Sequence, residues 1–489
     1  EGGSRAFMAA YNSWNGIPMS IHPCLEEITR KQWGNNGIIC TDGGALKLLI
    51  EAHKSFPSFA EGAAAVVKAT TGQFLDAYVP YVKEALEKGL LTEVDIDKAI
   101  RGNIFVALKL GLLDGDNSRN PYLSIGKNST ETPPFMTAEA RRLAREVTAK
   151  SVVLLKNKKL LPLDAGKLRK IAVIGPYSDK IVQDWYSGTP PYETTILSGI
   201  RNAVKEGTEI IHAEDNRMGQ AEKAAAAADV AIVCVGNHPY GTRADWKFSP
   251  VPSDGREAVD RKSLMLPDED LVKLVLKANP NTILVLVSSF PYTINWSQEH
   301  VPAIVHITHC SQEQGNGLAD VLFGKVNPAG RTVQTWVKDI TDLPDMMDYD
   351  IRNGRTYMYH QGPVLYPFGY GLSYSDFAYE KIESFKQDKK NIRVTVSVKN
   401  TSGRDGEEVV QLYASYPESK VERPSKQLRA FRRIPIKAGE TRKVTLTVPK
   451  EELGYWNEGK QMFVVEPGTV KLLIGASSED IRLEGKIRL

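Results

Sequence analysis

Short, nearly wholly apolar runs separated by helical stretches constrain this chain more than any other feature. They are residues 171–174, 230–235, 282–287 and 303–306. Strands that are apolar on both faces are typical of parallel sheets, because helices cover both sides of such sheets. The alanine-rich stretch 224–228 suits one of those covering helices. The pattern predicts an α/β sandwich over residues 136–372.

The first 115 residues show the same alternation on a smaller scale. Residues 6–11 and 37–41 are expected to be strands, and 45–53 have helical spacing. Residues 63–69 suit either a third strand or the start of a helix. Thr92 precedes an amphipathic helix that ends at Gly111, with apolar side chains four residues apart at Ile96, Ile100, Ile104 and Leu108. This region is predicted to be a parallel α/β unit, followed by a polar linker over 116–135.

From about residue 373 the hydrophobic period changes to two. Residues 392–398, 443–448 and 470–474 alternate apolar and polar side chains between turns rich in Gly, Pro and Asn. This pattern predicts an antiparallel β-sandwich over 373–489. Its basic stretch from Arg423 to Arg433 is expected to be a solvated loop and edge strand, with a ligand surface as the alternative.

Composition excludes several classes of protein. The 489 residues include 62 basic and 59 acidic side chains, and the net charge of +3 indicates neither a nucleic acid nor an anionic membrane as partner. No apolar run reaches the roughly 18 residues of a membrane-spanning helix. The cysteines are far apart and form no CxxC pair, so we expect half-buried thiols and no zinc site. They are Cys24, Cys40, Cys234 and Cys310.

Motifs for nucleotide, metal and serine chemistry are missing from the sequence. The chain has no phosphate-binding loop and no GxSxG, HExxH or GxGxxG motif, so we expect no cofactor and disfavour a nucleotide-dependent enzyme. His306 and His309 follow an apolar strand and are expected to be hydrogen-bonded structural residues, not metal ligands. The chemistry is therefore left to carboxylates.

Asp42 is the first candidate carboxylate. It ends the apolar run 37–41 and precedes Gly43 and Gly44, which permit a close approach of ligand or backbone. A polar residue at the carboxyl end of a barrel strand points into the active-site mouth. An Asp at a strand-to-helix turn also serves as a helix N-cap. The residues alone leave both interpretations open.

A second candidate lies in the polar segment Ser253-Asp-Gly-Arg-Glu-Ala-Val-Asp-Arg261. Glu257 is the proposed catalytic group of this segment, and Asp254 competes with it. A solvated loop charge is the alternative for Glu257. Asp260 and Arg261 are expected to be structural, as an ion pair or a helix start.

Several motifs, taken in order, are similar to those of glycoside hydrolase family 3. They are Phe7-Met-Ala-Ala-Tyr-Asn-Ser-Trp-Asn-Gly-Ile-Pro18, Gly37-Ile-Ile-Cys-Thr-Asp42, Ser151-Val-Val-Leu-Leu-Lys-Asn157, Ile174-Gly-Pro176, Tyr186-Ser-Gly-Thr-Pro190, Asn327-Pro-Ala-Gly-Arg331 and Tyr366-Pro-Phe-Gly-Tyr-Gly-Leu-Ser-Tyr374. The resemblance covers essentially the whole chain. It implies that 1–115 are the carboxyl-terminal part of a (β/α)8-type barrel. It further implies that 136–372 are an α/β sandwich and 373–489 a fibronectin type III-like domain.

The resemblance implies a retaining, exo-acting β-glycosidase that releases terminal glucose or xylose. Asp42 matches the nucleophile, and Glu257 matches the acid/base of an E-x-x-D-R pattern. Glu257 is favoured over Asp254 for its longer side chain and its offset from Asp260-Arg261. A retaining mechanism requires the two carboxyl groups about 5–5.5 Å apart. Tyr11 lies in the strand whose tyrosine neighbours the nucleophile, where its hydroxyl would help to keep that carboxylate ionised.

The residues that contact the sugar, and the sugar itself, are less clearly indicated by the sequence. Trp185, Tyr186 and Trp246 are candidate platforms for stacking sugars, with ordinary packing as the alternative. The run Tyr186-Ser-Gly-Thr-Pro-Pro191 resembles the xylosidases of the family. A glucosidase is nevertheless favoured, because that activity is the more widespread one in the family. The resemblance also favours export to the periplasm or the medium.

Two departures from the family pattern bear on function. Thr41-Asp42-Gly43-Gly44 lacks the aromatic residue that usually follows the nucleophile, which leaves the substrate subtype open. The first five or so barrel strands are missing here, and three strands cannot close a barrel. We therefore expect a second polypeptide to supply the remaining strands. The alternative function is a non-catalytic carbohydrate-binding or assembly subunit.

Overall fold

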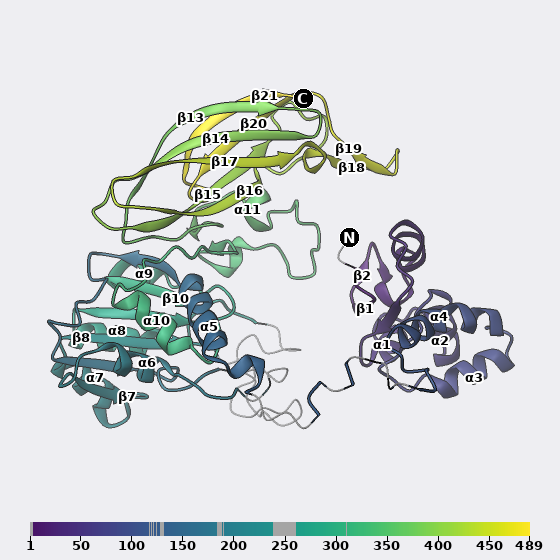
Figure 1. Ribbon diagram of the computed structural model, residues 1–489, viewed down its shortest axis with the longest axis horizontal. Helices are drawn as coiled ribbons and strands as arrows, with labels where there is room; N and C mark the ends of the chain where they lie inside the picture. Colours follow the sequence, from purple (N-terminus) through teal and green to yellow (C-terminus); the bar gives the residue numbers. More distant parts are fainter. Residues whose placement is uncertain are drawn as a thin grey trace. The chain divides into compact units, whose positions relative to one another are not determined.

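The chain forms two compact units, Glu1–Glu131 and Thr132–Leu489 (Figure 1). The computed structural model describes residues 3–116, 118, 120, 122–123, 125–127, 132–182, 188, 190–237, 261–309 and 311–489. Over these residues, no helix combines the length and the apolar character that crossing a bilayer requires.

The first unit is built on neighbouring parallel strands. β1 (Ala6–Ala9) pairs in parallel with β4 (Ile38–Thr41), and a single parallel bridge joins Cys40 of β4 to Gln73. Within the described residues of this unit the strands do not close into a barrel. The other elements are β2 (Ser13–Trp14), β3 (Ile17–Pro18), the 3-10 helix Met19–Ile21, the π-helix Leu25–Gln32, α1 (Ala45–Glu51), α2 (Phe59–Lys68), α3 (Val79–Glu87) and α4 (Glu93–Lys109).

Two helices of this unit, α2 and α4, begin at residues whose side chains cap them. Residues 63–68 belong to α2, which starts after Ser58, whose hydroxyl accepts a hydrogen bond from the Glu61 amide. The predicted helix after Thr92 is confirmed as α4, with a capping box between Thr92 and Asp95. Its apolar stripe is only partly covered, because 45% of Ile104 and 54% of Leu108 remain exposed. An uncovered apolar stripe fits a parallel sheet of so few strands.

The second unit opens with a six-stranded sheet in the order β5-β10-β9-β8-β6-β7. All neighbours are parallel except β5, which runs antiparallel to β10 at one edge. The four predicted apolar strands are confirmed as its centre. The strands are β5 (Val153–Asn157), β6 (Lys170–Ile174), β7 (Glu209–Ala213), β8 (Val230–Gly236), β9 (Thr282–Val287) and β10 (Ala303–Ile307).

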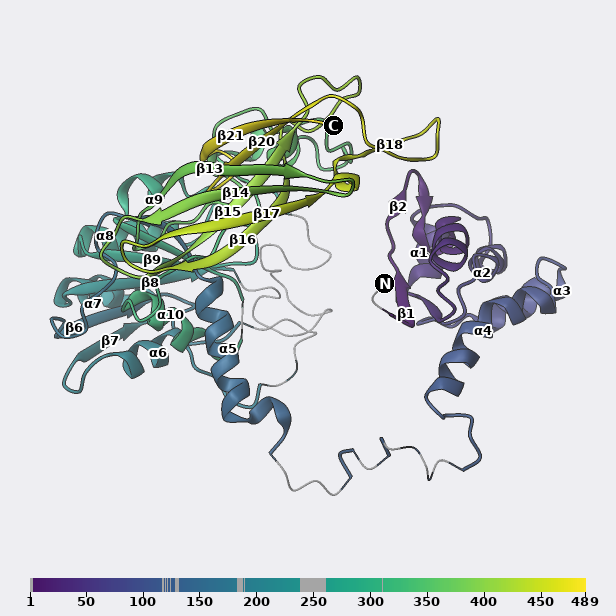
Figure 2. The same ribbon diagram turned by 45° about the horizontal axis from the view of Figure 1, so that its top comes forward.

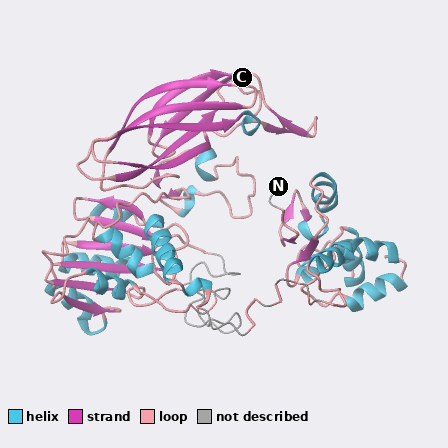
Figure 3. Cartoon of the chain, in the orientation of Figure 1, coloured by secondary structure: helices cyan, strands magenta, loops and turns pink. Residues whose placement is uncertain are grey.

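Helices cover both faces of this sheet, as Figure 3 shows by colour. Alternate strand residues face opposite cores: Ile232 packs with α5, α6 and α10, while Val233 packs with α7 and α8. The helices are α5 (Ala138–Ser151), α6 (Ile196–Ala203), α7 (Gln220–Ala227), α8 (Glu269–Ala278), α9 (Asn295–His300) and α10 (Gln314–Leu322), with 3-10 turns at Pro134–Met136 and Arg217–Gly219. The predicted α/β sandwich is confirmed.

The last part of the chain is a β-sandwich of two antiparallel sheets (Figure 2). The sheet orders are β13-β14-β17 and β16-β15-β20-β21, and the inward apolar residues of both form one core. The strands are β13 (Phe377–Gln387), β14 (Asn391–Asn400), β15 (Gly406–Ser415), β16 (Gln427–Ile436), β17 (Thr441–Pro449), β20 (Thr469–Gly475) and β21 (Ile481–Arg488). The predicted sandwich is confirmed, and the basic stretch does form an edge strand, β16.

Smaller elements accompany the sandwich. A hairpin of β18 and β19 projects beyond its body in Figures 1 and 2. Before the sandwich, β11 pairs with β12 near a short helix. These elements are β11 (Trp336–Val337), the 3-10 helix Ile340–Asp342, α11 (Thr356–Tyr359), β12 (Val364–Tyr366), the 3-10 helix Lys450–Leu453, β18 (Tyr455–Asn457) and β19 (Met462–Val464).

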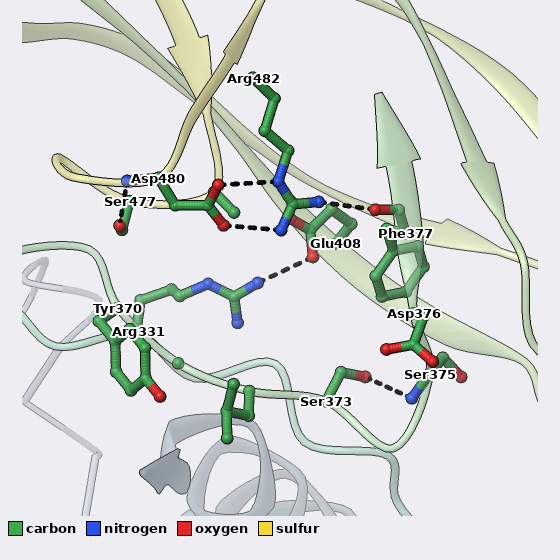
Figure 4. Close-up of a pocket in the computed structure, with 13 residues that line it drawn as sticks. Arg331, Tyr370, Ser373, Ser375, Asp376, Phe377, Glu408, Ser477, Asp480 and Arg482 are labelled. Carbon is green, nitrogen blue, oxygen red and sulfur yellow. Dashed lines mark hydrogen bonds and ion pairs between the residues drawn. The ribbon is translucent and has the colours of Figure 1, made fainter. Parts of the chain in front are cut away.

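A polar joint connects the α/β sandwich to the β-sandwich. Arg331 reaches Glu408 of β15, and Arg482 of β21 holds Asp480 through two hydrogen bonds (Figure 4). These side chains surround a pocket of about 200 Å³. Arg331 belongs to one of the family-like motifs of the sequence. That motif therefore helps to hold the α/β sandwich and the β-sandwich together.

Candidate active site

Asp42 lies directly after β4, where the strand ends and the chain turns toward α1. Thr41 is fully buried at the strand end, whereas Asp42 is partly exposed. Its Oδ1 atom accepts a hydrogen bond of 2.7 Å from the Gly43 amide. Oδ2 has no hydrogen-bond partner in the part of the chain that the structure describes. One carboxylate oxygen is thus held by the backbone and the other keeps its lone pairs.

Asp42 does not cap the helix that follows it. The N-cap residue of α1 is Gly44, which adopts a left-handed backbone with φ of 81° and offers no side chain. The Gly44 amide donates to Oδ1 of Asp76. The N-cap interpretation of Asp42 is therefore wrong, because a different carboxylate meets the free amide at this turn.

Tyr11 lies beyond the end of β1, not in the strand as expected, and beside the same loop. Its hydroxyl donates to the Gly43 carbonyl at 2.5 Å, although the two residues are 32 positions apart. The Tyr11 carbonyl lies 3.0 Å from Nε2 of His53, which lies just beyond α1. Tyr11 thus ties the segment after β1 to the backbone immediately beyond Asp42.

Asp76 is a residue of this region that the sequence did not single out. It follows the segment that bridges β4, and Leu75 beside it donates its amide to the Thr41 hydroxyl at 3.3 Å. Oδ2 of Asp76 is buried without a partner among the described residues. The available signal was its position directly after an apolar pair, Phe74-Leu75, at the same sheet edge as Asp42.

Negative charge at this edge affects neighbouring groups. Burial, and then the charge of Asp42, raise the pKa of the Cys40 thiol. Burial, and then the charge of Asp76, raise the pKa of Tyr78. Both groups therefore stay protonated near neutral pH, and Cys40 is not an activated thiolate.

Five of the residues proposed from the sequence lie outside the described part of the chain. They are Trp185, Tyr186, Trp246, Asp254 and Glu257. Arg261 beside them is described, and its guanidinium lies 3.8 Å from the centre of the Phe290 ring and donates to the Pro291 carbonyl at 3.0 Å. Arg261 is thus a stacked cation, whereas the predicted ion pair or helix start with Asp260 lies outside the described residues.

His306 lies within β10 and His309 follows that strand, and both are hydrogen-bonded, as predicted. Nε2 of His306 lies 3.0 Å from the Ser288 carbonyl, and Nε2 of His309 lies 2.8 Å from the Asn237 carbonyl. Over the described residues, no group of three His, Cys, Asp or Glu side chains is placed to hold a metal ion.

Family models match most of the chain. Residues 1–102 match the glycosyl hydrolase family 3 N-terminal domain, and residues 152–374 match the C-terminal domain of the same family. Residues 408–478 match a fibronectin type III-like domain. The three matches follow the chain in the order that the sequence motifs indicated.

Curated relatives and solved structures agree with these models. A periplasmic β-glucosidase of Salmonella typhimurium is 30% identical over 99% of this chain and 67% of its own length, and a β-xylosidase of Formosa agariphila is 29% identical over 98% and 68%. A β-glucosidase structure from Erythrobacter marinus matches with a TM-score of 0.84 and 26% identity, covering 100% of this chain and 68% of that one. A β-glucosidase from Listeria innocua, solved with isofagomine, has a TM-score of 0.83 and 26% identity over 99% and 68%.

This chain spans about two thirds of the length of those relatives. Each relative carries the matched region on a single polypeptide, so the expected second polypeptide gains no support. The predicted fold class and hydrolase function are confirmed by the same matches. The chain belongs to glycoside hydrolase family 3.

Proposed function

We propose that this glycoside hydrolase is a retaining, exo-acting β-glycosidase in which Asp42 is the nucleophile. The observation that carries the proposal is Oδ2 of Asp42 at the carboxyl end of β4, which no described residue binds. It lies on a loop whose backbone is held by three side-chain hydrogen bonds. Oδ1 accepts from the Gly43 amide, Tyr11 holds the Gly43 carbonyl and Asp76 holds the Gly44 amide. A nucleophile that is fixed in place attacks with less loss of orientational freedom.

The reaction follows from two carboxyl groups with different roles. Oδ2 of Asp42 attacks the anomeric carbon while a protonated carboxyl group donates its proton to the departing oxygen, which leaves a covalent glycosyl-enzyme. The second group then takes a proton from water, and the hydroxyl releases the sugar from Asp42. Glu257 is proposed for this acid/base role, with Asp254 as the alternative. Trp185, Tyr186 and Trp246 are proposed to stack against the sugar.

The substrate class is a terminal β-linked glucose, with xylose as the alternative. Relatives with both activities match this chain at nearly equal identity, since the β-glucosidase is 30% identical and the β-xylosidase 29%. A ratio of kcat/KM for p-nitrophenyl β-glucoside over the corresponding xyloside above one would support the glucosidase assignment. A ratio below one would reverse it.

The nucleophile is tested with Asp42→Asn in the purified full chain. Asn is isosteric and cannot form the glycosyl ester, so we expect kcat to fall at least about 10³-fold with binding retained. The matched control is Asp97→Asn, an exposed carboxylate on α4, which should keep full activity. Near-normal turnover by Asp42→Asn would reject the assignment. Saccharide binding by the wild-type chain with no hydrolysis at all would favour a binding subunit.

The acid/base is tested with Glu257→Gln and Asp254→Asn. Loss of the acid slows substrates with poor leaving groups far more than activated aryl glycosides, because only the former need protonation. External azide should restore turnover in the correct variant by replacing water at the second step. The residue whose variant shows both effects is the acid/base.

A further inference from the structure

A second hollow with the chemistry of a sugar site lies on the β-sandwich side of the second unit. It has a volume of about 680 Å³ and is formed where the segment around α11 meets the chain before β16 and the β18–β19 hairpin. Every lining residue lies in the described part of the chain. The hollow includes the start of the basic stretch of the sequence, which the proposed catalytic function does not use.

Arg423 is fixed in the wall of this hollow. Its guanidinium lies 3.7 Å from the centre of the Tyr416 ring and 5.6 Å from that of Tyr455, while Nη2 donates to the Leu453 carbonyl at 2.9 Å. A guanidinium sandwiched in this way has little freedom to turn. Its Nη1 atom has no acceptor among the described residues. Because that atom is itself buried, Arg423 acts in this wall as a rigid planar cation.

Arg429, at the start of β16, is held in a similar manner. Nη2 donates to the Gln427 amide oxygen at 2.5 Å and lies 3.4 Å from the Tyr416 hydroxyl. Its Nε atom likewise has no acceptor among the described residues. The Nε atom is buried, so Arg429, like Arg423, is held with its guanidinium partly inside the wall of the hollow.

Aromatic side chains line the hollow or lie next to a residue that lines it. Phe463 lines it and is 67% exposed, and the opposite residue of the hairpin, Trp456, is 48% exposed. The two rings meet edge to face with centroids 5.3 Å apart. Exposed aromatic faces grouped beside fixed polar groups mark binding sites more often than ordinary surface. Rings of this kind offer a flat apolar surface to a ligand that is polar at its edges.

The charges of the lining indicate a neutral ligand. Three carboxylates, Glu422, Glu451 and Glu452, lie in the same hollow as the two arginines. An anion would meet the carboxylates and a cation would meet the guanidinium groups. A polyhydroxylated molecule can donate to the former and accept from the latter, with its ring face on the aromatic side chains.

We propose that this hollow is an oligosaccharide-binding site that takes β-linked glucose or xylose chains. The choice of a saccharide rests on the family of the chain and on the neutral, ring-and-donor chemistry of the lining. The site contains none of the residues proposed for catalysis, so binding here and cleavage at Asp42 are separable by mutation.

The test is calorimetric titration of the full chain with cellohexaose and, separately, xylohexaose. Asp42→Asn is used as background to prevent hydrolysis, and product analysis reports whether that substitution has worked. Phe463→Ala in this background should weaken binding of at least one of the two hexasaccharides at least tenfold. The matched control is Phe431→Ala on β16, since Phe431 is 66% exposed in the same domain but does not line the hollow.

The outcomes separate this proposal from the catalytic one. Hydrolysis of p-nitrophenyl β-glucoside by Phe463→Ala without the background substitution should equal that of the wild type. Unchanged hexasaccharide affinity in both Phe463→Ala and Arg423→Met would overturn the site. A wild-type dimer in sedimentation velocity that Phe463→Ala converts to a monomer would also overturn it, because the hollow would then be occupied by a second copy. Continued hydrolysis by Asp42→Asn would instead count against the nucleophile alone.

Discussion

Arg331 and Glu408 form an ion pair of 2.9 Å across the joint of the second unit, although only 9% and 3% of their side chains are exposed. Glu408 also accepts a hydrogen bond of 2.9 Å from the Tyr379 hydroxyl, and Arg331 donates to the carbonyl of Gly330. Figure 4 shows the pair between the two layers. Both charges are buried with their partners, so each depends on the other.

Removing one member of this pair should destabilise the second unit. Glu408→Gln leaves the Arg331 charge buried without a counter-ion, and we expect a loss of about 3 kcal/mol in the free energy of unfolding. Arg331→Met combined with Glu408→Gln should lose less than the sum of the two single changes. Urea denaturation followed by tryptophan fluorescence measures both. As a control, Asp350→Asn breaks an exposed pair with Arg352 and should leave stability unchanged. Additive effects of the buried pair would contradict this account.

Gly371 belongs to the family-like motif 366–374 and packs against Gly330, the residue before Arg331. It has no room for a side chain. A Cβ atom there would lie 2.1 Å from the carbonyl oxygen of Gly330. A backbone oxygen cannot move aside as a side chain can, so Gly371→Ala should cost at least about 3 kcal/mol, the upper end for overpacking. Gly403→Ala is the control, because nothing lies within 4 Å of its added Cβ. Equal melting temperatures of the two variants would refute the steric explanation.

The parts of the fold that sequence predicts are those where one physical pattern dominates. β8 and β9 are continuous apolar runs, and such runs suit a sheet covered on both faces. β7 was not anticipated, because its burial is partial and its residues Glu209 and His212 interrupt the apolar pattern. The hairpin of β18 and β19 was missed because each strand has only three residues and none of them is buried.

The candidate site divides in a similar way. Asp42 was found because a carboxylate directly follows an apolar strand, and Tyr11 because its motif resembles a family. Asp76 was missed because its strand-like segment makes a single bridge at Gln73 and has no strand pattern of its own. The role of Arg331 in joining two layers is equally invisible in sequence, since its partner Glu408 lies 77 residues away.

His306 should make stability depend on pH. Burial, with a smaller contribution from His309, lowers the pKa of His306 to about 4, against about 6.5 in the unfolded chain. The unfolded state therefore binds a proton between these values that the folded state does not, so stability is present above pH 6.5 and is lost as pH falls toward 4. Because the ring is partly exposed, we expect this loss to be about 2 kcal/mol.

The substitution His306→Gln isolates that contribution. Gln retains a donor for the Ser288 carbonyl and does not titrate. Calorimetric melting temperatures at pH 7 and pH 4.5 should therefore differ less in this variant than in the wild type. An unchanged pH dependence would show that other groups cause the acid destabilisation.

Asp76 should act on catalysis by positioning the loop that carries Asp42. Asp76→Ala removes the acceptor of the Gly44 amide, and a lost charge-assisted hydrogen bond of about 2 kcal/mol corresponds to a roughly 30-fold change if all of it is expressed in the transition state. Because the bond orients the nucleophile without touching substrate, kcat should fall and KM should change little. Steady-state kinetics with p-nitrophenyl β-glucoside measures kcat and KM separately and so tests this expectation.

The conservative variant separates the hydrogen bond at Gly44 from the charge of Asp76. Asp76→Asn still presents an oxygen to the Gly44 amide, so it should recover most of the activity that Asp76→Ala loses, although the buried position of Oδ2 now holds an amide nitrogen. Asp97→Ala removes an exposed carboxylate from the same unit and controls for net charge. If Asn lost as much kcat as Ala, the negative charge near Asp42 would be the important property, and the geometric role of Asp76 would be wrong. If Ala lost no activity, the Gly43 amide and Tyr11 would be sufficient to hold the nucleophile loop.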